Sequence, residues 1–238
     1  MPLYPIKLST TPGFKIIKQW LDKQQRKPFA FQQQTWEAII NHQSGLVNAP
    51  TGFGKTYSVF LGAAIQFINN NPTDFLTKKN NGLQLLWVTP LRALAKDIER
   101  AMCEVVEELG MAWKIGSRNG DTPTAERAKQ KRQLPEVLII TPESLHLFLA
   151  QKNYAETFKH LKTIAVDEWH ELLGSKRGVQ VELAVARIVG LKELKVQGSK
   201  FKVEGANPLS KISISNNQIH ARQGYCRVCK CWNCGLST

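Results

Sequence analysis

Short apolar runs alternate with longer helical patterns from about residue 32 to residue 190. A short apolar run bounded by turn residues is typical of a strand that is buried on both faces. The runs are GLVNA at 45–49, LQLLWVT at 83–89, AWKIGS at 112–117, VLIIT at 137–141 and TIAVD at 163–167. The alternation predicts an α/β fold, with a mainly parallel sheet, helices on both faces and right-handed crossovers.

Three helices can be placed from the same pattern. The first spans residues 91–110, where apolar residues recur at helical spacing and Gly110 supplies a stop. The second opens at Thr122 and Pro123, which fit an N-cap and a first helical position. The third spans residues 179–189. Each lies where a crossover between parallel strands, or a helix after the last of them, is expected.

Composition and charge narrow the class of protein. With 238 residues, of which 42% are apolar, the chain can form one full α/β domain. Its net charge of +13 favours a polyanionic partner, either nucleic acid or an acidic membrane surface. No secretory segment is visible, and the longest apolar stretch, YSVFLGAAIQFI, is too short to span a bilayer. Because the body of the chain holds a single thiol, Cys103, we expect a soluble cytoplasmic protein with no membrane association.

Residues 45–56, GLVNAPTGFGKT, read as a buried strand, a glycine-containing turn and the start of a helix. They meet the template of a phosphate-binding loop, with Ala49 in the first glycine position. In such a loop the glycines turn N–H groups onto phosphate oxygens, Lys55 reaches the β and γ phosphates, and the Thr56 hydroxyl binds Mg²⁺. The candidate nucleotide-binding residues are Ala49, Pro50, Thr51, Gly52, Phe53, Gly54, Lys55 and Thr56.

An acid pair follows the last apolar run, in the stretch TIAVDEWH. The carboxyl ends of parallel strands are where α/β sheets keep their chemistry. A Mg²⁺ nucleotide needs a carboxylate on the metal, which Asp167 can supply, and a group that activates the attacking water, which Glu168 can supply. An isolated Asp-Glu pair would indicate a solvated turn, but its place after a buried strand favours catalysis.

These blocks resemble a known superfamily. Residues 167–170 look like motif II of the superfamily 2 DExH-box helicases, and residues 49–56 look like motif I. Other blocks are similar in the same order: Phe31-Gln32 with Trp36 to the Q motif, residues 89–94 to motif Ia, and residues 141–144 to motif Ib. With residues 120–122 and 174–178, the set resembles Lhr-type helicases, especially the ligase-associated bacterial branch, from about Thr10 to Val196.

The resemblance implies a RecA-like P-loop domain of an ATP-dependent DNA helicase or translocase that acts in DNA repair. It implies ATP and Mg²⁺ as cofactors, single-stranded DNA as the partner, and repair proteins, including a DNA ligase, as further partners. It assigns adenine recognition to Gln32, although by chemistry alone either neighbouring glutamine would serve. His170 would couple the nucleotide site to the DNA site, the alternative being a packed histidine at a helix start. The catalytic residues are then Lys55, Asp167, Glu168 and His170.

Two strand-to-helix turns, at residues 89–92 and 141–144, form a candidate nucleic-acid face. Their first N–H groups and hydroxyls can hold phosphates of a single strand without reading its sequence. The second turn is also simply a good helix start, with Thr141 as cap and Pro142 at the first position, and backbone contacts do not separate DNA from RNA. The candidates are Thr89, Pro90, Arg92, Gly120, Asp121, Thr141, Pro142 and Glu143, with Arg118, Lys176 and Arg177 as weaker ones.

The sequence leaves the family pattern after about residue 196. Where a Ser-Ala-Thr motif III is expected, the chain reads Gln-Gly-Ser-Lys at 197–200. We therefore expect a lead-in at 1–31, a RecA-like domain at 32–196, and an irregular basic tail at 197–238 that is disordered or foreign to the family. The tail cysteines suit zinc in number but are spaced more closely than usual zinc ligands. They are Cys226, Cys229, Cys231 and Cys234.

Helicases of this type have two RecA-like domains, the second of which supplies arginine fingers, and this chain has room for only the first. We expect weak nucleotide binding, little ATPase activity and no processive unwinding by the chain alone. Two alternatives stay open: a non-catalytic nucleic-acid-binding protein with a vestigial nucleotide site, and an RNA helicase fragment. The intact Lys55, Asp167 and Glu168 argue against a vestigial site.

Overall fold

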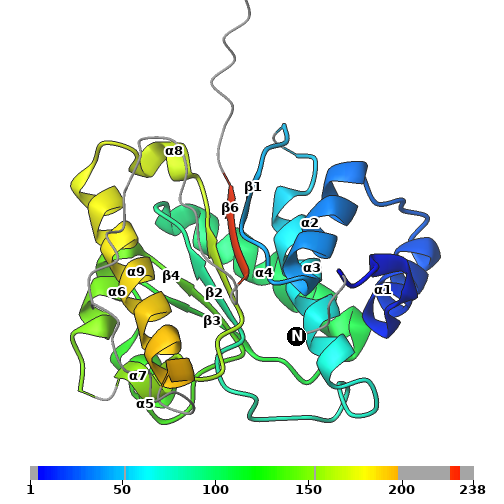
Figure 1. The fold of residues 1–238 in the computed structure, drawn as a ribbon. Coiled ribbons are helices and arrows are strands. Elements are labelled where there is room, and N and C mark those ends of the chain that lie inside the picture. Colours follow the sequence, from blue (N-terminus) through cyan, green and yellow to red (C-terminus); the bar gives the residue numbers. More distant parts are fainter. Residues whose placement is uncertain (1–4, 51, 153, 198–225, 231–238) are drawn as a thin grey trace, which may run out of the picture.

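A computed structural model describes residues 5–50, 52–152, 154–197 and 226–230. Its centre is a six-stranded parallel sheet with helices on both faces (Figure 1). The spatial order of the strands is β1-β6-β5-β2-β4-β3. Their bounds are β1 Gly45–Val47, β2 Leu85–Val88, β3 Ile115–Arg118, β4 Val137–Ile140, β5 Thr163–Val166 and β6 Cys226–Lys230. The predicted fold class is confirmed, and the five apolar runs are the first five strands.

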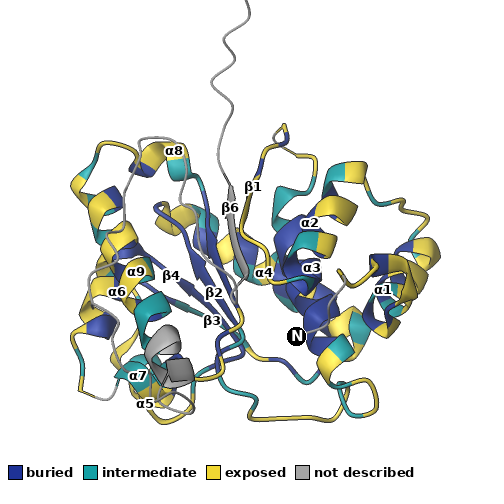
Figure 2. Ribbon diagram, in the orientation of Figure 1, coloured by how far each residue is buried: buried dark blue, intermediate teal, exposed yellow. Residues whose placement is uncertain are grey.

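Three central strands, β2, β4 and β5, are buried along their whole length (Figure 2). Successive side chains of a strand point to opposite faces, so each strand feeds two cores. In β2, Leu85 and Trp87 join one core, while Leu86 and Val88 join the other. Burial on both faces explains why these strands appear in the sequence as continuous apolar runs.

The helices cover the two faces of the sheet. Those on the first face are α1 Pro12–Lys23, α2 Ala30–Ile40, α3 Lys55–Asn70 and α4 Arg92–Leu109. Those on the second are α6 Pro142–Leu149, α8 Trp169–Leu172 and α9 Lys176–Gln197. The short η1 Leu8–Thr10 precedes α1, while α5 Thr124–Arg132 follows β3 and α7 Tyr154–Thr157 follows α6. None of these described helices is long and apolar enough to cross a membrane.

The helix predictions are confirmed in two cases and wrong in one detail. Helix α4 ends at Gly110, which adopts the left-handed conformation of a helix stop, and α9 contains the predicted 179–189 segment. The second helix, α5, begins at Thr124 with Pro123 as its N-cap. Thr122 does not cap it, because its hydroxyl accepts a hydrogen bond from the N–H of Asn119 at 2.9 Å and so belongs to the preceding turn.

Strand β6 is an unexpected element in the region predicted to be an irregular tail. Residues 226–230 pair in parallel with β1 on one side and with β5 on the other. The prediction of an irregular tail is therefore wrong for these five residues. A strand here satisfies backbone groups of both neighbours, which do not pair with each other. The rest of the tail, including Cys231 and Cys234, lies outside the described residues.

The contact between α1 and α3 depends on Gly13. An added β-carbon at this position would lie 2.5 Å from the carbonyl oxygen of Ile65 and 3.0 Å from its Cα, both backbone atoms. The N–H of Gly13 also donates to Asn69 Oδ1 at 2.8 Å. Because backbone cannot move aside as a side chain can, α1 sits this close to α3 only without a side chain here.

We predict that Gly13→Ala lowers the free energy of unfolding by about 1–3 kcal/mol, because α1 must move away from α3. The matched control is Gly190→Ala in α9, where a new β-carbon meets nothing within 4 Å. That change should raise stability by up to about 1 kcal/mol through helix propensity. Urea unfolding measures both, and equal effects of the two changes would contradict the close approach.

Candidate nucleotide and nucleic-acid site

Four strands end at one level, and this level defines the site. Val88 of β2 pairs with Ile140 of β4 and with Val166 of β5, and Ile140 also pairs with Arg118 of β3. Hydrogen bonds continue the ladder for one more step. The sequence blocks predicted to carry chemistry therefore leave the sheet side by side at its carboxyl edge. The first residues beyond the edge are Thr89, Asn119, Thr141 and Asp167.

The phosphate-binding loop joins β1 to α3 at the same edge. Gly52 and Gly54 adopt φ values of 85° and 77°, which side chains disfavour. Nothing lies within 4 Å of where a β-carbon of Gly52 would be, so the loop is open on that side. Lys55 begins α3, and its ammonium group donates to the carbonyl oxygen of Ala49 at 2.7 Å, across the loop. Thr51 lies outside the described residues.

Gln32 braces this loop against α2. Its amide oxygen accepts from the N–H of Phe29 at 2.9 Å, and its amide nitrogen donates to the carbonyl oxygen of Gly54 at 3.3 Å. Gln32 is buried, whereas Gln33 and Gln34 are exposed. The half-exposed rings of Phe29 and Phe53 meet at the loop with centroids 5.5 Å apart. An apolar surface therefore borders the phosphate loop.

The acid pair is held in two different environments. Asp167 is 2% exposed, and its Oδ1 accepts from the N–H of Glu168 at 2.9 Å. Its Oδ2 accepts from the indole N–H of Trp87 at 3.3 Å. Glu168 is the N-cap of α8 in a left-handed conformation with φ 46°, and its side chain is 29% exposed. The turn thus keeps one carboxylate inside the protein and turns the other outward.

His170 is the second residue of α8, two positions after Glu168. Its Nδ1 is 3.4 Å from Glu168 Oε2, and its Nε2 is 3.2 Å from Glu171 Oε1. The ring therefore bridges the outward acid and the next acid of the helix, and it is not a packed core histidine, because its side chain is 43% exposed.

The donor set at this edge fits Mg²⁺ together with a triphosphate. A carboxylate and a hydroxyl are the hard oxygen ligands that Mg²⁺ prefers, and it usually takes its remaining ligands from water and phosphate. Among the described residues no three His, Cys, Asp or Glu side chains converge into a cage that could hold a metal by themselves. Asp167 and Thr56 would be the protein ligands, and the loop N–H groups would face the phosphates.

The predicted nucleic-acid residues are brought together by surface ion pairs. Arg92 Nη1 lies 3.3 Å from Asp121 Oδ1, with both side chains more than half exposed. Arg92 also packs on Gly120, where a β-carbon would lie 3.0 Å from Nη2. Arg127 donates to the carbonyl oxygens of Asn119 and Gly120 at 3.0 and 2.9 Å. The turn at 119–122 therefore lies directly beside the start of α4.

Arg177 joins the other two blocks. Its Nη2 donates to the carbonyl oxygen of Pro90 at 2.7 Å, and its Nε donates to Glu143 Oε1 at 2.6 Å. Burial alone would raise the pKa of Glu143, but hydrogen bonds from its own backbone N–H and from Arg177 outweigh burial, so the pKa lies below its ordinary value. Arg177, only a weak candidate from the sequence, therefore links the segment that follows the acid pair to both strand-to-helix turns.

Thr141 has the helix-cap role that the sequence predicts, whereas Thr89 caps no helix and Arg118 is not a surface charge. Thr89 is fully buried and Leu91, not Thr89, is the N-cap of α4, whereas Thr141 is the N-cap of α6 with Pro142 following. The Thr89 hydroxyl has no hydrogen-bond partner among the described residues. Arg118 is buried, 4.7 Å above the Phe148 ring, and burial, followed by the charge of Arg127, lowers its pKa.

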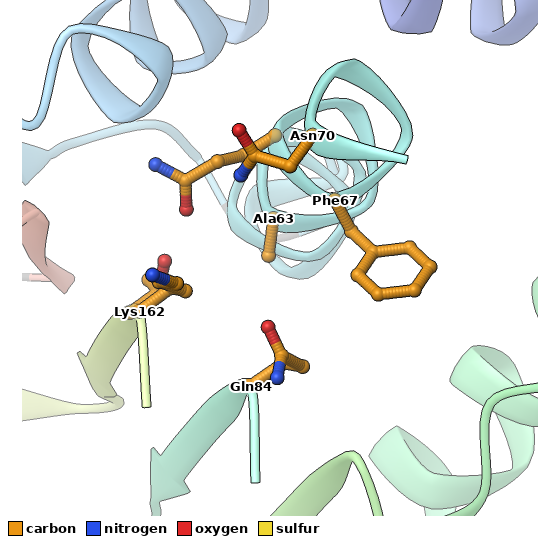
Figure 3. Close-up of a pocket in the computed structure, with 7 residues that line it drawn as sticks. Ala63, Phe67, Asn70, Gln84 and Lys162 are labelled. Carbon is orange, nitrogen blue, oxygen red and sulfur yellow. The ribbon is translucent and has the colours of Figure 1, made fainter. Parts of the chain in front are cut away.

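A small pocket lined by both polar and apolar residues lies at the opposite edge of the sheet (Figure 3). Gln84 and Lys162, which precede β2 and β5, face Asn70 and Phe67 of α3 there. With a volume of about 10 Å³, this pocket has room for roughly one water. It therefore takes no nucleotide, and the candidate site is the open carboxyl edge.

The fold and this edge together define a P-loop nucleotide-binding domain of the RecA-like class. The sequence pattern of the DEAD/DEAH box helicases matches residues 29–199. The chain therefore belongs to the DEAD/DEAH box helicase family.

Similar relatives are Lhr helicases, which confirms the resemblance found from the motifs. The chain is 33% identical over 191 residues to the Lhr helicase/uracil glycosylase of Escherichia coli, covering 76% of the chain and 12% of that protein. It is 28% identical over 214 residues to the ATP-dependent helicase Lhr-Core of Methanocaldococcus jannaschii, covering 86% of the chain and 25% of that protein. The chain thus spans a quarter or less of these relatives.

A solved structure of an Lhr helicase is also similar to this chain. The helicase Lhr of Mycobacterium smegmatis, bound to ssDNA and AMP-PNP, superposes with a TM-score of 0.62 at 34% identity. The match covers 76% of this chain and 24% of that one. A DNA strand and an ATP analogue are thus bound in that relative, of which this chain corresponds to about one quarter.

We predict a coupling between Glu143 and Arg177 that disappears in acid. Comparing Glu143→Gln, Arg177→Met and the double variant should give about 0.5 kcal/mol at pH 7, a small value because both groups are partly exposed. A lowered folded pKa means that this stability is present above the ordinary pKa of 4.5 and is lost as pH falls through the folded value. Urea unfolding at pH 7 and pH 3.5 checks it, and a coupling that does not weaken in acid would contradict the ion pair.

Proposed function

We propose that residues 32–196 are the first RecA-like motor domain of an ATP-dependent DNA helicase. The domain would bind MgATP at the loop joining β1 to α3 and single-stranded DNA across the three turns that follow β2, β3 and β4. The observation that carries this proposal is the common level of the strand ends, at which Asp167, Thr89 and Thr141 follow three successive strands of the sheet.

The nucleotide half of the proposal assigns each group a task. The loop N–H groups and the positive end of α3 hold the phosphates, and Lys55 exchanges its bond to Ala49 for phosphate oxygens. Asp167 and Thr56 hold the metal, which supplies charge neutralisation at the phosphates when bound. Glu168 accepts a proton from the attacking water. His170, in contact with Glu168, relays changes at this carboxylate toward the nucleic-acid side.

Binding of nucleic acid would depend on surface ion pairs in which a phosphate can replace the acidic partner. Arg92 and Arg177 are paired with Asp121 and Glu143 at the surface, where each ion pair is worth about 0–1 kcal/mol. A DNA phosphate can replace such a partner at little cost. Together with the N–H groups at the start of α6, these residues would hold the backbone and leave the bases unread. This suits a motor that must accept any sequence.

We also propose a cellular role, a location and partners for this protein. The motif resemblance supports a role in DNA repair with partners that include a DNA ligase, and the single thiol in the body of the chain supports a cytoplasmic location. Processive unwinding needs a second RecA-like domain that completes the site with arginine fingers. We therefore expect residues 1–238 alone to bind nucleotide weakly and to turn it over slowly. Single-stranded RNA would use the same backbone contacts as single-stranded DNA, so binding of DNA and of RNA is compared in the tests below.

We predict that Lys55→Ala weakens binding of a fluorescent ATP analogue at least about tenfold, because the phosphate charge loses its nearest cation. Glu168→Gln should bind as tightly as the wild type and lower any remaining turnover by about 10²-fold or more, since the water loses its base. Fluorescence titration and phosphate release measure these. Glu182→Gln, an exposed acid on α9, is the control. A Lys55→Ala variant that binds like the wild type would refute the site.

We predict that Arg92→Ala weakens binding of single-stranded DNA to a similar extent for every sequence tested. The slope of log affinity against log salt should fall by about 0.7, the value for one lost contact to a single strand. Lys15→Ala, an exposed lysine on α1, should leave the slope unchanged. Titrations with DNA and RNA oligonucleotides at several salt concentrations give the slopes. A sequence-dependent loss would argue against backbone binding.

A further inference from the structure

A buried tryptophan lies behind the acid that would hold the metal. Trp87, in the middle of β2, is fully buried. Its indole N–H donates to Asp167 Oδ2 at 3.3 Å, while the N–H of Glu168 donates to Oδ1 at 2.9 Å. Each oxygen of the carboxylate therefore has a donor that fixes its direction.

The register of the sheet makes this contact. Trp87 is paired with Ala165 of β5, and Asp167 comes two residues later, so its side chain leaves on the same face of the sheet. Such diagonal neighbours on adjacent strands lie within reach of an aromatic side chain. Trp87 and Ala165 belong to the same core on this face of the sheet. A shift of one residue in the pairing would turn Asp167 to the other face.

We propose that Trp87 is a positioning residue, whose indole N–H orients the Asp167 carboxylate for Mg²⁺. This rests on the proposed function, in which Asp167 is the metal ligand. Donors behind a ligating carboxylate fix its orientation, and their loss typically costs about 10- to 100-fold in metal affinity. An indole N–H is a neutral donor that cannot accept a proton. It can therefore hold the carboxylate without cancelling the charge that the metal needs.

Ordinary core packing would not by itself produce this bond. Trp36 and Trp113 are also buried, and their indole nitrogens have no hydrogen-bond partner among the described residues. Trp113 packs between the rings of Phe60 and Phe67. Its burial serves the core, whereas Trp87 adds a directed bond to the acid at the edge of the sheet.

The test is Trp87→Phe, which keeps an aromatic ring and removes the donor. A fluorescent ATP analogue is titrated in EDTA and again at increasing Mg²⁺ concentrations. Binding in EDTA should stay within about twofold of the wild type, because the phosphate loop is untouched. The Mg²⁺ concentration at the midpoint should rise about tenfold. Asp167→Asn, which removes the ligand itself, sets the upper limit of this shift.

Trp113→Phe is the matched control, because it makes the same change at a buried tryptophan whose indole has no described partner. It should leave the Mg²⁺ midpoint unchanged even where it lowers stability. A wild-type midpoint in Trp87→Phe would overturn the positioning role alone. If nucleotide binding by the wild type does not respond to Mg²⁺, the proposed function fails and the positioning role fails with it.

A second measurement covers the case in which Trp87→Phe does not fold. In the protein with ¹⁵N-labelled tryptophan, Asp167→Asn should shift one indole N–H resonance, and Mg²⁺ with nucleotide should shift the same resonance in the wild type. Glu171→Gln, the acid beside His170, should not move it. Indole resonances that ignore both Asp167→Asn and Mg²⁺ would overturn the proposal.

Discussion

The in-register ending of β2, β4 and β5 is the constraint on which the whole site depends. Val88 pairs with both Ile140 and Val166, so the residues that follow these strands leave the sheet at one level. Thr89, Thr141 and Asp167 are separated by dozens of residues in the sequence, yet the ladder brings them to one edge. A one-residue shift in either pairing would reverse which face each side chain occupies. The packing of the two apolar cores fixes the register of these strands, and therefore also fixes which side chains meet at the carboxyl edge of the sheet.

The site is held firmly on one side and loosely on the other. Asp167 is buried, and two N–H donors fix its oxygens. Arg92 and Arg177 are held by surface ion pairs, which contribute little and are weakened by salt. In the proposed function this difference is useful, because a metal ligand must stay in place while contacts to a moving strand must form and break. The positions of these groups at the sheet edge, more than their number, support a motor domain.

The sequence predicted the elements of this fold better than their tertiary contacts. Five strands were recognised because burial on both faces leaves continuous apolar runs, and the helix of α4 because its apolar stripe ends in Gly110. The cap of α5 was misplaced because Thr122 takes part in a turn with Asn119. Strand β6 has no apolar run from which it could be predicted. It forms because β1 and β5 leave a place between them, where β6 pairs with both. The contacts of Trp87 and Arg177 needed the strand register, which one sequence does not reveal.

The same sheet order bears on the geometry of the nucleotide site. Strand β1 carries the phosphate loop and β5 carries the acid pair, and β6 lies between them. Adjacent strands are about 4.8 Å apart, so one intervening strand separates β1 from β5 by about 10 Å. Direct pairing of β1 with β5 would shorten this separation by one strand spacing, so β6 sets the distance between the phosphate loop and the acid pair. The distance between the two halves of the proposed nucleotide site therefore depends on five residues from a distant part of the chain, which pair with both strands.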